Sequence, residues 1–247
     1  MADVHEVTEG VWSLGDVPRV NFYALQEGGR VTVIDAGLGG YWGRLERGLL
    51  AMGRTLGDVE AIVLTHAHID HIGIAERLRN EANAVVRVHS DDLDWALGRS
   101  SPPLKMGAMF RHVPRVLPFL FYFLRNGGVR FNKVLEASAF GDGETLELPG
   151  RPRVIHMPGH TPGECALLAE SRRVLFSGDA LVTMHPLSHA RGPQVMGSTF
   201  DADSKLALES LRRLEGVEAD LVLPGHGEPW SGGVEAAVTE ARRRGSD

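Results

Sequence analysis

Four side chains that commonly bind metals lie within six consecutive positions, directly after an apolar run of strand type. The stretch, residues 62–73, reads I-V-L-T-H-A-H-I-D-H-I-G. Imidazoles and a carboxylate crowded at one strand end lose hydration unless they find partners, and a metal ion is the simplest partner. His66 and His68 are two residues apart, so an extended backbone projects both to the same side, whereas Asp70 and His71 fall in the turn that opens the next helical pattern. One stretch can therefore supply ligands to two adjacent metal ions.

Three further side chains of ligand type lie in similar loops downstream. His160, Asp179 and His226 each follow an apolar strand pattern and sit beside glycine, which lets the backbone approach a crowded centre. With the first stretch they make five imidazoles and two carboxylates, a set that suits Zn²⁺ or a neighbouring first-row metal better than Mg²⁺ or Ca²⁺. Seven ligands exceed what one tetrahedral ion needs, so two ions that share a carboxylate are the economical arrangement.

Four motifs, spread along the chain, together carry a resemblance to a known family. They are T-H-A-H-I-D-H at 65–71, P-G-H-T-P-G at 158–163, S-G-D at 177–179 and P-G-H-G at 224–227. In this order they resemble the metallo-β-lactamase superfamily. The resemblance implies a single α/β domain over residues 1–247, built as a four-layer αββα sandwich with the metals at one edge between the two sheets.

The resemblance also implies a role for each ligand candidate. The first metal would be bound by His66, His68 and His160, the second by Asp70, His71 and His226, and Asp179 would bridge them. We expect two Zn²⁺ ions, with Fe, Mn or Co as alternatives, and a bridging hydroxide as nucleophile. Asp70 could also act catalytically by orienting that hydroxide and carrying its proton. Asp35 matches a family aspartate near the site whose role is structural rather than metal binding.

Residue types and segment lengths around the motifs indicate to which branch of the family the chain is most similar. True β-lactamases typically lack an aspartate at the bridging position, which is Asp179 here, and they are exported. The glyoxalase II branch adds a C-terminal helical domain, whereas 21 residues follow His226. The nucleases need a larger insertion between these two residues, and the flavodiiron proteins replace the histidine equivalent to His68 by glutamate. We therefore predict a compact hydrolase of the lactonase or esterase type. It would act on an ester, lactone or related acyl bond of a small molecule.

Other functions remain open at this point. A phosphodiesterase would use the same two-metal centre, and a β-lactamase is a weaker alternative. A mononuclear iron sulfur dioxygenase would need only a His-His-Asp subset of the ligands. A binding domain without catalysis is disfavoured because no ligand of the set is missing.

The alternation of strand and helix patterns indicates an α/β layered domain. Strand patterns occupy 11–14, 20–25, 31–34, 84–88, 144–148, 153–157, 166–169, 174–176 and 220–223. Helical patterns occupy 42–52, the residues after the ligand stretch to about 80, 91–97, a segment with Leu206, Leu208, Leu211 and Leu214, and the residues from 234. Glu27-Gly28-Gly29-Arg30 predicts a hairpin turn, and Asp203 or Ser204 predicts a helix N-cap.

A basic and apolar segment interrupts this acidic chain. Residues 95–135 contain no Asp or Glu but seven basic residues, Arg99, Lys105, Arg111, Arg115, Arg125, Arg130 and Lys133. We interpret 99–133 as a helical insertion that serves in packing or as a homodimer contact, as a lid for an apolar or anionic substrate, or as a membrane-surface element. If it is a lid, deleting residues 104–125 should impair long-chain but not minimal substrates.

Composition excludes several other classes. The net charge of −6 gives no support for nucleic-acid binding. The single cysteine, Cys165, permits no intrachain disulfide and is expected to be buried and inert. No apolar secretory segment opens the sequence, so we expect a cytoplasmic protein. The longest apolar run, 116–124, is too short to span a bilayer and is expected to be broken by Pro118, so we expect no stable membrane insertion. The remaining candidates are read as ordinary loop histidines: His89, His156, His185 and His189.

Overall fold

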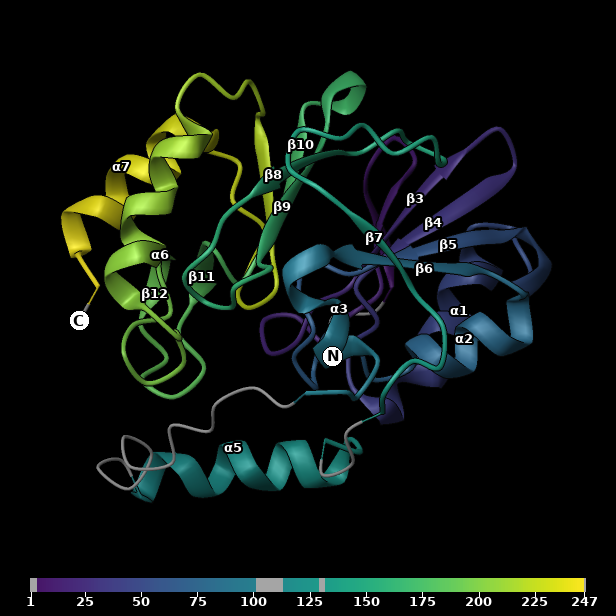
Figure 1. Ribbon diagram of the computed structural model, residues 1–247, viewed down its shortest axis with the longest axis horizontal. Helices are drawn as coiled ribbons and strands as arrows, with labels where there is room; N and C mark the ends of the chain where they lie inside the picture. Colours follow the sequence, from purple (N-terminus) through teal and green to yellow (C-terminus); the bar gives the residue numbers. More distant parts are fainter. Residues whose placement is uncertain (1–3, 101–112, 129–131, 247) are drawn as a thin grey trace.

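Two β-sheets pack face to face between outer layers of helices (Figure 1). The computed structural model describes residues 4–100, 113–128 and 132–246. Helices α1 (Trp42–Ala51) and α2 (Ala75–Ala82) cover the first sheet, and α6 (Ser204–Ser210) and α7 (Val234–Arg244) cover the second. The predicted four-layer αββα class is therefore confirmed.

The first sheet has seven strands in sequence order. They are β1 (His5–Thr8), β2 (Val11–Ser13), β3 (Tyr23–Glu27), β4 (Arg30–Ile34), β5 (Val59–Val63), β6 (Val85–His89) and β7 (Ser138–Phe140). Pairing is antiparallel from β1 to β4 and parallel from β4 to β7. The predicted hairpin joins β3 to β4, and Gly28 and Gly29 have φ of 56° and 86°, which suits glycine.

The second sheet has four strands in the order β13-β10-β9-β8. Their bounds are β8 (Arg153–His156), β9 (Cys165–Ala169), β10 (Val174–Gly178) and β13 (Leu221–Pro224). Strands β10 and β13 are parallel, and the other pairs are antiparallel. A separate two-stranded ribbon is formed by β11 (Val182–Met184) and β12 (Arg191–Gln194).

The remaining helices are short except for α5. They are α3 (Leu93–Ala96), α5 (Val113–Arg125) and the 3₁₀ turns η1 (Gly39–Tyr41), η2 (Leu56–Asp58), η3 (Ser90–Asp92), η5 (Glu170–Arg172) and η6 (Leu211–Leu214). The predicted N-cap of α6 is Asp203, whose side chain accepts from the Leu206 N–H at 2.9 Å. No helix among the described residues is both long and apolar enough to cross a membrane.

Three apolar clusters hold the layers together. One lies between the first sheet and α1 and α2, and another between the second sheet and α6 and α7. The third lies between the sheets, where Tyr23, Ile34 and Val63 of the first sheet meet Leu167 and Phe176 of the second. Burial on both faces explains why these strands read as nearly continuous apolar runs.

The structure differs from the sequence-based expectations at several short elements. Residues 144–148 do not form a strand but only an isolated bridge, in which Thr145 faces Arg153. Pro152 beside it accepts from the Leu146 N–H but has no N–H to return, so a ladder cannot continue there. Pro118 does not break the apolar run, because α5 continues through it. In the insertion, 101–112 and 129–131 lie outside the described residues, and Lys105, Arg111 and Arg130 with them.

Candidate metal centre

The seven predicted ligands come from four chain segments that meet at one edge between the sheets. The first four lie in the loop after β5, and the other three lie in the second half of the chain. His160 lies in the loop between β8 and β9, Asp179 directly follows β10, and His226 follows β13. Strand β5 ends at Val63, so the first loop is longer and less extended than the sequence suggested. All seven side chains nevertheless converge.

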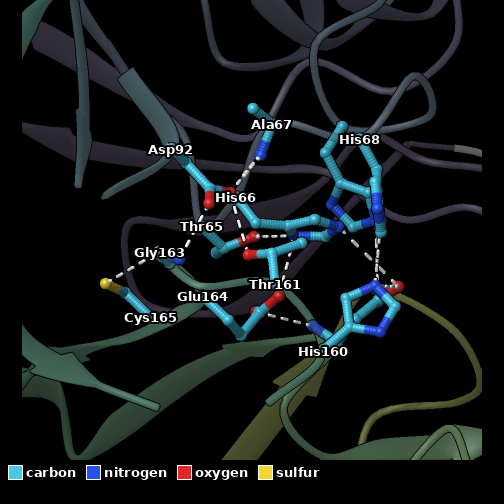
Figure 2. Close-up of polar contacts among 12 residues, drawn as sticks. Thr65, His66, Ala67, His68, Asp92, His160, Thr161, Gly163, Glu164 and Cys165 are labelled. Carbon is cyan, nitrogen blue, oxygen red and sulfur yellow. Dashed lines mark hydrogen bonds and ion pairs between the residues drawn. The ribbon is translucent and has the colours of Figure 1, made fainter. Parts of the chain in front are cut away.

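Their ligand atoms form two groups that lie next to each other. Nitrogen atoms of His66, His68 and His160 lie within 4.8 Å of one another, and so do ligand atoms of Asp70, His71 and His226. These are the two sets that the sequence motifs indicate. Figure 2 shows the rings of the first set pointing toward one another, with His68 Nδ1 2.9 Å from His160 Nε2.

The carboxylate of Asp179 lies between the two groups. One oxygen, Oδ2, is 3.4 Å from His160 Nε2, 3.3 Å from His226 Nε2 and 4.0 Å from His66 Nε2. The other, Oδ1, is 3.5 Å from His71 Nε2. A carboxylate with one oxygen toward each set has the geometry that a bridging ligand requires.

Most of the rings are oriented by a partner on the nitrogen that faces away from the cluster. His160 Nδ1 lies 3.1 Å from Asp201 Oδ1, and His226 Nδ1 donates to the carbonyl of Arg19. His71 Nδ1 lies 2.9 Å from Asp35 Oδ2. Such partners fix the tautomer and direct the other nitrogen toward a metal.

Asp35 is fully engaged in this positioning role. Besides His71, it accepts from the Thr65 N–H at 2.8 Å and from Thr65 Oγ1 at 3.0 Å. Its φ of 60° lies in the left-handed region, which aspartate tolerates better than most residues. Asp35 thus connects the end of β4 to the ligand loop and orients one of its imidazoles.

Glu164 is a buried carboxyl group that sequence reasoning missed. Its Oε2 lies 3.1 Å from His66 Nδ1 (Figure 2). Its Oε1 accepts from the Asp179 N–H at 3.0 Å. Burial and the nearby Asp179 charge raise the pKa of Glu164 well above its usual range. Its position directly after the P-G-H-T-P-G motif was the only sequence signal that could have suggested it.

Asp92 joins the two ligand loops and was also missed. Its Oδ2 accepts from the Ala67 N–H at 3.0 Å and from the Thr161 hydroxyl at 2.8 Å, and its Oδ1 accepts from the Gly163 N–H at 2.7 Å (Figure 2). The side chain is completely buried. Asp92 therefore fixes the position of the loop that contains His66 relative to the loop that contains His160.

Glycine is required beside the cluster. A Cβ at Gly225 would lie 2.2 Å from Asp179 Oδ1 and 2.7 Å from His71 Cε1, well inside contact distance. The glycine that precedes His226 therefore lets the β13 loop approach the other ligands closely.

The electrostatics of the cluster separate its imidazoles into two kinds. Burial and neighbouring imidazoles lower the pKa of His66 and His68, the latter to about 3. Burial alone would lower the pKa of His226 as well, but the carboxylates of Asp179 and Asp70 raise it to about 10. His66 and His68 are therefore held in the neutral form that binds metals, whereas the surroundings of His226 attract positive charge.

Three buried atoms at the centre of the cluster indicate whether a cation would fit there. His66 Nε2, His71 Nε2 and Asp179 Oδ1 have no hydrogen-bond partner within the described residues. Buried polar atoms normally have partners, so these atoms point to a group that binds nitrogen and oxygen at once. The donor set fits divalent first-row metal ions.

A second group of ligand type does not fit a metal in the same way. His89, Asp91 and His156 have ligand atoms within 4.8 Å of one another, but the two imidazole rings stack at 4.0 Å with an interplanar angle of 13°. Imidazole binds a metal in the plane of its ring, and two stacked parallel rings cannot place one ion in both planes. This pair instead connects β6 to β8, one strand from each sheet.

Two more histidines from the sequence lie outside the cluster, and Cys165 is buried as predicted. His185 Nδ1 accepts from the N–H groups of Leu187 and Ser188, both at 3.1 Å, within the loop between β11 and β12. His189 lies in the same loop and is exposed.

The model of one protein family matches residues 15–226, and its description is metallo-beta-lactamase superfamily. This chain belongs to the metallo-beta-lactamase superfamily. The match spans the first three motifs, the fourth as far as His226, and every residue of the metal cluster. The superfamily assignment thus agrees with both the resemblance in the sequence and the convergence of the ligands.

Individual relatives and a solved structure are also named as metallo-hydrolases or as members of this superfamily. The chain is 29% identical over 198 residues to the probable metallo-hydrolase YflN of Bacillus subtilis, covering 76% of this chain and 72% of that protein. It is 28% identical over 125 residues to the hydroxyacylglutathione hydrolase GloC of Haemophilus influenzae, half of each chain. The metallo-beta-lactamase family protein TTHA1429 of Thermus thermophilus superposes with a TM-score of 0.70 at 28% identity, covering 97% of this chain and 80% of that structure.

Helix α5 contacts two segments that carry partners of the cluster histidines. In its last turn the Tyr122 hydroxyl donates to Asp16 Oδ2 at 2.9 Å, three residues before Arg19, whose carbonyl binds His226. One turn earlier, the ring of Phe119 lies 6.2 Å from that of Phe200, the residue before the partner of His160. Figure 1 shows α5 extending below both halves of the molecule.

Proposed function

We propose that this protein is a metal-dependent hydrolase that cleaves an ester, lactone or related acyl bond of a small molecule. The observation that carries the proposal is the convergence of two three-residue ligand sets on one carboxylate, Asp179, with buried atoms left unpartnered between them. The named relatives support hydrolysis, and the hydroxyacylglutathione hydrolase supports an acyl bond in particular.

The ligand sets determine which residues would hold the metals. His66, His68 and His160 would hold one ion, and Asp70, His71 and His226 the other, with Asp179 shared. Two Zn²⁺ ions, or other first-row divalent ions, would supply Lewis acidity and a water molecule whose pKa is lowered to about 7.

The chain's own residues position the substrate and move the proton. Asp70 is nearly buried, with Oδ2 3.4 Å from His226 Nε2, so its carboxylate can accept a proton from water and return it to the leaving group. The Trp95 ring stacks on His68 at 6.3 Å and gives an apolar wall beside the cluster. The inner face of α5 would cover an acyl chain and exclude water from it.

A substrate panel on protein of measured metal content tests the proposal. We expect about two metal ions per chain, and turnover of p-nitrophenyl esters, lactones and acyl thioesters that exceeds turnover of bis-p-nitrophenyl phosphate at least about tenfold. Faster cleavage of the phosphodiester would instead support the phosphodiesterase alternative. One iron per chain together with oxygen uptake would support the sulfur dioxygenase, and penicillin hydrolysis above ester hydrolysis would support a β-lactamase.

The role of α5 as a lid is tested by replacing Phe119 on its inner face by alanine. We expect kcat/KM for a long-chain ester to fall about tenfold, because an apolar contact with the acyl chain is lost, with little change for an acetyl ester. Phe121→Ala is the matched control, since Phe121 lies on the same helix but is 64% exposed. An equal loss for both esters would show that Phe119 serves packing alone.

A further inference from the structure

Helix α5 has an apolar face on each side, and only one of them contacts the protein. Phe123 is buried, and Phe119 and Tyr122 pack against the core beneath the helix. The opposite side presents four large apolar side chains to solvent. They are Leu117, Leu120, Phe121 and Leu124, which are 62%, 43%, 64% and 47% exposed.

These four residues form a continuous stripe rather than scattered positions. Their spacing, i, i+3, i+4 and i+7, places them on one face of a helix. They are four of the eight large apolar side chains that are exposed within the described residues. Single exposed apolar residues are ordinary, but a stripe of this kind marks an interaction surface.

The one charged side chain of α5 that the structure describes is basic. Arg125 is exposed and lies four residues after Phe121, on the same side of the helix, and Lys133 is exposed nearby in the sequence. The acidic residues that flank the segment, Asp94 and Glu136, pair with Arg99 and Arg79 instead. The whole segment 95–135 lacks Asp and Glu, although the protein carries a net charge of −6. The partner of this surface must therefore accept apolar groups and positive charge together.

We propose that the outer face of α5 binds the surface of an anionic lipid bilayer. An apolar stripe bordered by basic residues is the pattern of a helix that lies in the membrane interface, with its apolar side chains in the acyl boundary and its cations at the headgroups. Pairing of two copies through the same face would leave the positive charge without an acidic partner within the segment, which contains no Asp or Glu. The negative remainder of the protein would be repelled by the bilayer, so binding is oriented through α5. This binding does not depend on the hydrolase activity.

Vesicle co-sedimentation of the full chain tests the proposal. We expect binding to vesicles of phosphatidylcholine with added phosphatidylglycerol, and at least about tenfold weaker binding to vesicles of phosphatidylcholine alone. Salt should weaken binding to the anionic vesicles. The double variant Leu120→Glu with Phe121→Glu should lower binding at least about tenfold, because it places two charges in the apolar stripe. Arg125→Glu should also reduce binding to the anionic vesicles.

Leu50→Glu is the matched control, because Leu50 is 78% exposed on α1, a different surface of the protein. Its binding should equal that of the wild type, and circular dichroism should show that all variants fold. No binding of the wild type to anionic vesicles would overturn the proposal, as would equal binding to neutral vesicles. A dimer in light scattering that the double variant dissociates, without vesicle binding, would assign the stripe to a second copy of the chain instead.

Discussion

Replacing Asp179 by alanine is expected to remove both bound metal and turnover. The carboxylate lies between the two ligand sets, so its loss deprives each of them of an oxygen ligand and leaves four buried imidazoles without a central negative charge. We expect metal content after purification to fall below one ion per two chains, and kcat/KM for the best substrate to fall by about three orders of magnitude. Metal analysis and kinetics on the same preparation measure both.

Asp220→Ala is the control for this variant, because Asp220 is an exposed carboxylate that pairs with Arg173 at the surface. It should leave metal content and activity unchanged, since exposed ion pairs contribute little. If the Asp179 variant folds and retains two metal ions with full activity, the shared carboxylate is not a ligand and the proposed centre is wrong.

The second large effect concerns stability. Asp92→Asn is expected to lower the free energy of unfolding by about 3 kcal/mol, because an amide cannot accept all three of the hydrogen bonds that the buried carboxylate accepts. The loops that contain His66 and His160 lose their common anchor, so metal affinity should also fall, by about tenfold or more. Chemical denaturation and competition with a chelator measure the two effects.

Asp94→Asn provides a matched comparison two residues away. Its side chain is 67% exposed and pairs with Arg99 at the long distance of 3.6 Å, so the variant should change stability by less than about 0.5 kcal/mol. Equal stability of the two variants would mean that the three hydrogen bonds of Asp92 contribute little net free energy.

The ligands could be predicted because four of them lie together after one apolar strand, and the other three each follow an apolar strand and sit beside glycine. That pattern is local, so it can be read from a single segment such as 158–163. Except for Asp35, which the family resemblance indicated, the residues that position the ligands could not be found this way. Asp92 contacts residues 25 and 71 positions away, and in the sequence it reads only as an acidic residue in the first turn of a helix. Burial, which makes such a carboxylate significant, is a property of the folded chain.

The fold was predictable where elements are long and strongly apolar. Strands β4, β5, β9 and β10 lie between packed layers and carry a clear signal. The three-residue strands β7 and β11 were missed, because a segment of that length has too few positions to establish a period. The role of the insertion was the hardest feature to predict. A helix that is apolar on two sides is compatible with packing, with a lid and with an external binding surface.

The predicted metal ligands are split between the two halves of the molecule, which has a consequence for biosynthesis. The four predicted ligands of the β5 loop emerge from the ribosome well before His226, so an early ion would meet only part of the proposed coordination sphere. Both sheets must dock before all seven side chains come together. Metal loading would therefore belong to the end of maturation, and bound ions would in turn hold together two parts of the chain that are translated far apart.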